Sequence, residues 1–90
     1  MGVVAVKIKL MPVSPETDLE KVRGETNKIL EKNNVKNPLF EIQPIAFGLK
    51  ALIVLFGWPE EKELEQLEES LKKIGGVNSV EVIDIRRAIG

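Results

Sequence analysis

Residues 40–56 limit the fold more than any other part of this chain. The segment begins with strand-like alternation that contains Pro44, and its second half, Lys50–Phe56, is apolar on both faces. Proline cannot donate a hydrogen bond to a neighbouring strand and is therefore confined to sheet edges, whereas a strand with two apolar faces is typical of a sheet centre. The sequence therefore predicts a hairpin whose first strand, Phe40–Ala46, lies at an edge and whose second strand lies inside the sheet.

Two further segments alternate as strands do. Every second residue from Val4 to Leu10 is apolar, which predicts a strand with one buried face near the N-terminus. A last strand is predicted over Val77–Ile85. The adjacent apolar residues Val82 and Ile83 break its alternation, and such a break indicates a β-bulge or burial of both faces.

Two segments have the periodicity of amphipathic helices. Apolar residues recur at helical spacing between Leu19 and Leu30, after Ser14 and Thr17 as candidate N-caps and before a stop at Asn33-Asn34. The second helix is predicted over Glu60–Ile74, where leucines follow a 3-4-3 spacing and glutamates and lysines fill the remaining positions.

The predicted order is strand, helix, strand, strand, helix, strand in one domain over residues 1–90. Two helices against one four-stranded antiparallel sheet make an α+β, ferredoxin-like sandwich, with both helices on one face of the sheet. Right-handed crossovers give the strand order 4-1-3-2. This order puts the Pro44 strand at an edge and the Lys50–Phe56 strand inside, which agrees with the composition of both.

The same topology places the hairpin turn and the end of the last strand at opposite ends of the sheet. The predicted hairpin turns at Phe47-Gly48, and the last strand runs back to finish near Arg86 and Arg87 at the opposite end. A partner that touches both ends must span roughly 20–30 Å for strands of this length. That distance favours a protein or a structured RNA over a small molecule.

Composition excludes several classes of function. The chain has no cysteine and no histidine, so disulfides, iron–sulfur clusters, zinc sites and histidine general bases are excluded, and we expect no metal or cofactor. A net charge of −1 argues against a dedicated nucleic-acid binder. No apolar stretch approaches the roughly 18 residues of a membrane span, and the first residues are typical of a strand rather than a signal peptide. We therefore expect a cytoplasmic protein with no membrane contact.

One stretch resembles a known family closely. Residues 44–52, PIAFGLKAL, are similar to the P-I-G/A-F/Y-G-I/L-K-x-L motif of the elongation factor 1-beta family. Further segments match that family in order: its first strand at Lys7–Pro12, the start of its first helix at Glu16–Leu19, and its closing strand at Val80–Ile85. The resemblance covers nearly the whole chain.

The resemblance implies a guanine nucleotide exchange factor that promotes GDP release from elongation factor 1-alpha during protein synthesis, without bond chemistry and therefore not as an enzyme. It implies that Phe47 docks on that G protein and that Lys50 is the motif lysine, with Pro44 and Gly48 in the same motif. The family also has a lysine near its C-terminus that acts at the magnesium site. That position falls at about Gly90 here, so Arg86 and Arg87 are the nearby cations.

Other interpretations of the same residues stay open at the level of sequence. Phe47 could fold back into the core, Lys50 could be a solvated strand-edge charge, and Arg86-Arg87 could be a solvated terminus.

An RNA-binding sheet of this topology needs aromatic residues on its two central strands. The corresponding positions are aliphatic or basic: Lys7, Lys9, Ala51, Ile53 and Leu55. A small-molecule regulatory domain is the remaining alternative, and the chain has no glycine-rich phosphate loop to support it.

Overall fold

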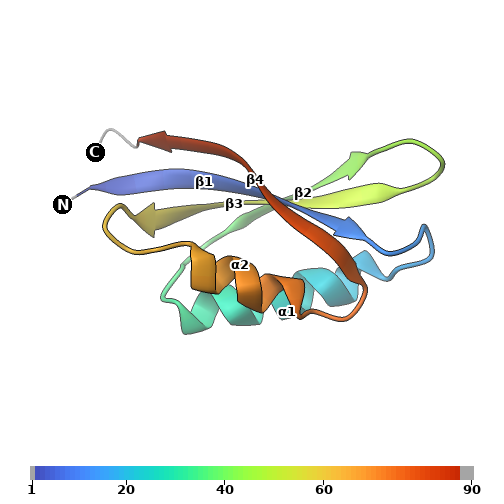
Figure 1. Ribbon diagram of the computed structural model, residues 1–90, viewed down its shortest axis with the longest axis horizontal. Coiled ribbons are helices and arrows are strands. Elements are labelled where there is room, and N and C mark those ends of the chain that lie inside the picture. The colour runs from blue at the N-terminus through green and yellow to red at the C-terminus, as the bar shows by residue number, and fades with distance from the viewer. Residues whose placement is uncertain (1, 88–90) are drawn as a thin grey trace.

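The predicted element order and sheet topology are confirmed. The computed structural model describes residues 2–87. Its elements are β1 (Val3–Pro12), α1 (Leu19–Lys32), β2 (Leu39–Pro44), β3 (Lys50–Pro59), α2 (Glu65–Lys72) and β4 (Val77–Arg87). The four strands form one antiparallel sheet in the order β2-β3-β1-β4, and both helices cover the same face of it (Figure 1). The chain therefore has the ferredoxin-like α+β arrangement.

The hairpin strands occupy the positions that their composition predicts. β2 pairs only with β3 and ends at Pro44, opposite Lys50, so the proline lies on an edge strand. β3 is bordered by β2 and β1, and its residues Ala51–Val54 are buried on both faces of the sheet. The missing proline N–H and the two apolar faces thus fix which strand is outside and which is inside.

The predicted irregularity in the last strand is a β-bulge. Lys7 of β1 is opposite Asp84 of β4, whereas Ile8 is opposite Val82, so Ile83 has no partner across the pair. One extra residue restores the alternation after the bulge. Val82 and Ile85 consequently lie on the same side of the sheet, opposite Ile8 and Val6, although three positions separate them.

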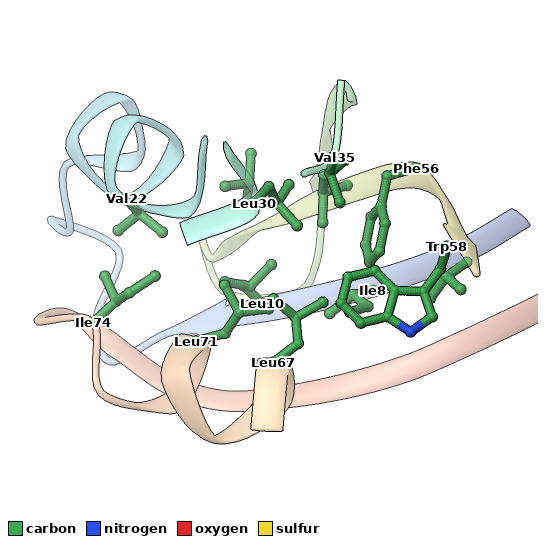
Figure 2. Close-up of a cluster of buried hydrophobic side chains, with 13 residues drawn as sticks. Ile8, Leu10, Val22, Leu30, Val35, Phe56, Trp58, Leu67, Leu71 and Ile74 are labelled. Atoms are coloured by element: carbon green, nitrogen blue, oxygen red, sulfur yellow. The ribbon is translucent and has the colours of Figure 1, made fainter. Parts of the chain in front are cut away.

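The core lies between the helices and the sheet. The even-numbered residues of β1 and β3 are turned toward α1 and α2, and the ring of Phe56 meets that of Trp58 edge-on, with centroids 5.9 Å apart. Figure 2 shows this cluster, to which both helices and both central strands contribute: Ile8, Leu10, Val22, Leu30, Phe56, Trp58, Leu67 and Leu71. The alternation and the helical spacing in the sequence therefore mark the same buried layer from two sides.

The expected first helix forms, but its N-cap differs from the prediction. Asp18 is the N-cap, and its side chain accepts hydrogen bonds from the backbone N–H groups of Glu20 and Lys21. The Thr17 hydroxyl instead accepts from Ser14 N inside the preceding loop. A carboxylate one residue closer to the helix satisfies two otherwise unpaired donors, which explains why Asp18 takes the position.

The second helix is shorter than the predicted Glu60–Ile74, and the strand before it is longer than predicted. β3 continues past Phe56 to Pro59 and pairs with the start of β1, which buries Trp58 to 1% exposure. The indole Nε1 of Trp58 then donates to the carbonyl oxygen of Lys62. Residues 60–64 therefore turn around this ring instead of forming the first turn of α2.

The two ends of the sheet carry different parts of the chain. Pro44 and Lys50 pair next to the β2–β3 connection, while Arg87 pairs with Val4 at the start of β1. The β2–β3 connection lies at one end of the long axis, and the start of β1 and the end of β4 lie at the other (Figure 1). The longest extent of the described residues is 42 Å, so the predicted separation of the two regions is confirmed.

Candidate functional site

A tight turn presents Phe47 at the end of the β2–β3 hairpin. Leu49 N donates to Ala46 O over 3.1 Å, and Ile45 N donates to Leu49 O over 2.7 Å. The two central residues both have positive φ, 60° at Phe47 and 77° at Gly48, as two-residue hairpin turns of type I′ require. Glycine adopts this conformation freely, whereas it costs a residue with a Cβ about 1–2 kcal/mol. Phe47 is thus held in a strained backbone conformation.

The Phe47 side chain points away from the rest of the molecule. It is 93% exposed, the highest value among the large apolar side chains described as exposed. The alternative that Phe47 folds back into the core is therefore wrong. A large aromatic ring combines high exposure with backbone strain here, and neither feature contributes to the stability of the isolated chain.

The loop between β1 and α1 lies beside the tip of the hairpin. A Cβ placed on Gly48 would lie 3.9 Å from Pro15 Cβ, so the two loops are close neighbours. Between them is an open depression of about 340 Å³, and its wall includes Lys50 and Asp18. Pro44, Phe47, Gly48 and Lys50 are all exposed and all lie at this end of the sheet. The four motif residues singled out in the sequence are therefore exposed together at the tip of the hairpin.

The two arginines at the end of β4 are both paired with carboxylates. Arg86 Nε lies 2.9 Å from Asp84 Oδ2, and Arg87 Nη2 lies 2.6 Å from Glu60 Oε1. The side chains of Arg86 and Arg87 nevertheless remain 81% and 77% exposed. The sequence prediction missed Glu60, because no local pattern links two residues that are 27 positions apart. The Gly90 position, at which the resemblance implies a lysine in the family, lies outside the described residues.

The sheet face opposite the helices has no aromatic side chain among residues 2–87. Phe40, Phe56 and Trp58 pack on the helix side, and Phe47 is at the tip. On the open face, Lys7 is opposite Asp84 and Lys9 is opposite Glu81, so that acidic residues of β4 border the lysines of β1. This face therefore lacks the stacking surface that single-stranded RNA recognition requires.

Residues 2–87 contain no group of three or more acidic, cysteine or histidine side chains that could hold a metal ion. An open concavity of about 480 Å³ lies along α1 and is bordered by Arg23, Asn27 and Phe40. No helix within these residues is long and apolar enough to cross a membrane. The hairpin tip and the end of β4 remain the candidate contact regions.

Comparisons with known proteins agree with the motif at the hairpin tip. The family model described as the EF-1 guanine nucleotide exchange domain matches residues 5–88. Elongation factor 1-beta of Methanosarcina barkeri is 42% identical over 88 residues, which cover 97% of this chain and 99% of that protein. The same factor of Methanosarcina acetivorans is 44% identical over 89 residues, with coverage of 97% and 99%.

A solved structure is similar in fold alone. The chain of BlrP1 BLUF superposes with a TM-score of 0.59 at 15% sequence identity, covering 98% of this chain and 56% of that chain. The likeness extends to the βαββαβ sandwich, which hosts many unrelated functions. The family model matches nearly the whole chain, and the two relatives match it over nearly their full length. This chain therefore belongs to the EF-1 guanine nucleotide exchange domain family.

Proposed function

We propose that this chain is a nucleotide exchange factor that promotes release of GDP from elongation factor 1-alpha during protein synthesis in the cytoplasm. In this proposal residues 1–90 act as one exchange domain, by binding and without bond chemistry. Family membership and the exposed motif residues support the role. A partner that prefers the nucleotide-free state of a G protein must weaken GDP binding by the same factor by which GDP weakens binding of the partner.

The observation that carries the proposal is the state of Phe47. An aromatic ring that is 93% exposed on a residue with φ of 60° stabilises nothing within its own chain. Large aromatic side chains that enter a partner's pocket are typical binding hot spots, and strained backbone often occurs at such places. We propose that Phe47 is the anchor of the interface, with Pro44, Gly48 and Lys50 around it.

The second contact is proposed at the end of β4. Arg86 and Arg87 lie at the opposite end of a molecule whose longest extent is 42 Å. A ligand the size of a nucleotide cannot bridge the two regions, whereas a multidomain G protein can. A two-ended contact would let the exchange factor hold one part of its partner while it disturbs another, which is the type of rearrangement that releases bound nucleotide.

The test measures release of fluorescently labelled GDP from elongation factor 1-alpha of the same organism. The chain should accelerate release at micromolar concentration, and Phe47→Ala should lower the acceleration about ten-fold or more, as expected for a hot spot. Leu39→Ala is the matched control, because Leu39 is 63% exposed at the other end of β2. No acceleration by the unmodified chain would refute the proposal, and equal effects of both variants would refute the role of Phe47.

A further inference from the structure

We infer that Glu60 is a positioning residue for the end of β4, acting through Arg87 so that Arg86 is presented to the partner. The inference rests on the proposed exchange function and divides the work of the two arginines. Arg86 contacts the partner in this inference. Arg87 and Glu60 form an ion pair, called the clasp below, which holds the end of β4 in place.

Glu60 is itself fixed by the start of the chain. Its backbone N–H donates to the carbonyl oxygen of Gly2 over 2.9 Å, directly after Val3 and Pro59 pair across β1 and β3. The Glu60 side chain lies over Gly2, where an added Cβ would collide with Glu60 Oε2. The carboxylate therefore lies against the backbone that precedes β1, at the same end of the sheet as Arg87.

The clasp ties down the end of an edge strand. β4 has a strand on one side only, and Arg87 is its last residue, opposite Val4. Strand ends of this kind open easily, because few contacts resist fraying. The 2.6 Å ion pair to Glu60 attaches Arg87 to the turn that follows β3. It connects β4 to an element with which it shares no hydrogen-bonded pairing.

Fixing Arg87 also fixes the direction of Arg86. Successive side chains of a strand point to opposite faces of the sheet. Arg87 is turned toward the Glu60 side, so Arg86, opposite Ala5, is turned to the open face. Its ion pair with Asp84 uses Nε, and an arginine has five N–H donors, so the guanidinium can still engage an acidic or carbonyl group of the partner. Without the clasp, the end of β4 would fray more readily, and Arg86 would be presented from a less fixed backbone.

The experiment compares Glu60→Gln with Glu61→Gln in the exchange assay over a series of concentrations of the chain. Both variants remove one exposed carboxylate, but only Glu60 pairs with Arg87. Glu60→Gln should lower the maximal release rate about two- to five-fold, the range expected for an exposed ion pair, while the half-saturating concentration stays unchanged because Phe47 still docks. The double variant Glu60→Arg with Arg87→Glu should recover most of the lost rate.

Two results would overturn the inference: equal rates for the Glu60 and Glu61 variants, or a double variant as slow as Glu60→Gln. The second result would mean that the charge at Arg87, and not the clasp, acts on the partner. Amide hydrogen exchange at Ile85–Arg87 gives a readout that needs no partner, and it should accelerate in Glu60→Gln alone. If the unmodified chain fails to release GDP, the proposed function fails, and hydrogen exchange still decides whether the clasp exists.

Discussion

The indole Nε1 of Trp58 donates a 2.9 Å hydrogen bond to the carbonyl oxygen of Lys62, and the Lys62 ammonium lies 4.7 Å from the centroid of the same ring. The ring is 1% exposed and also contacts Phe56. One side chain thus closes the end of the core and shapes the turn that contains Glu60. The stability of the fold and the geometry of the β4 clasp are connected through it.

Trp58→Phe should lower the free energy of unfolding by about 1–3 kcal/mol, because the Lys62 carbonyl loses its donor and the smaller ring leaves space. Urea denaturation measures this change. Lys62→Ala is the control, since it keeps the carbonyl and removes only the cation–π contact, which contributes about 0.5–1 kcal/mol at an exposed site. Equal losses in the two variants would contradict the role assigned to the hydrogen bond.

Phe47→Asn should raise the free energy of unfolding by about 1 kcal/mol while it abolishes the proposed docking. Asn-Gly is the preferred pair for a turn with two positive φ values, and the Phe47 ring contributes no burial that could be lost. Thermal unfolding followed by circular dichroism measures stability, and the GDP-release assay measures function. A less stable variant would show that the ring supports the fold.

Gly24→Ala should stabilise the chain by about 1 kcal/mol, the difference in helix propensity between the two residues. Gly24 lies inside α1, and an added Cβ would have nothing within 4 Å. Gly76→Ala is the opposite case, because Gly76 has a φ of 92° and its Cβ would come within 3.0 Å of Thr17 Cγ2. That variant should be less stable than the unmodified chain. Denaturation midpoints of the two variants that shift in the same direction would contradict this reasoning.

Much of the fold follows from local chemistry that the sequence displays directly. Pro44 lacks a donor and Lys50–Phe56 is apolar on both faces, and these two facts order the hairpin strands before any tertiary contact is considered. The break at Val82-Ile83 likewise indicates a bulge or burial of both faces, and the structure has the bulge. Such features need only the neighbouring residues, so they are visible in the sequence.

The errors of the sequence prediction share one cause. Helical spacing begins before Glu65, but Trp58 requires a partner for its indole N–H and draws residues 60–64 into a turn. Asp18, rather than the predicted Ser14 or Thr17, is the N-cap for a similar reason, since the Thr17 hydroxyl accepts a hydrogen bond from Ser14 N. In both cases a side-chain hydrogen bond between residues three or four positions apart decides the local structure, and the spacing of apolar residues contains no information about that bond.

The sequence by itself determined the order of elements, the edge and centre of the sheet, and the motif that identifies the family. Only the tertiary structure decided that Phe47 is exposed rather than buried, and that Glu60 and Arg87 meet. The physical reason is that exposure and long-range ion pairs depend on where distant segments come together. The periodicity of apolar residues shows which face of a helix or strand is apolar. Only the folded chain shows which residues contact that face and the ends of the helix or strand.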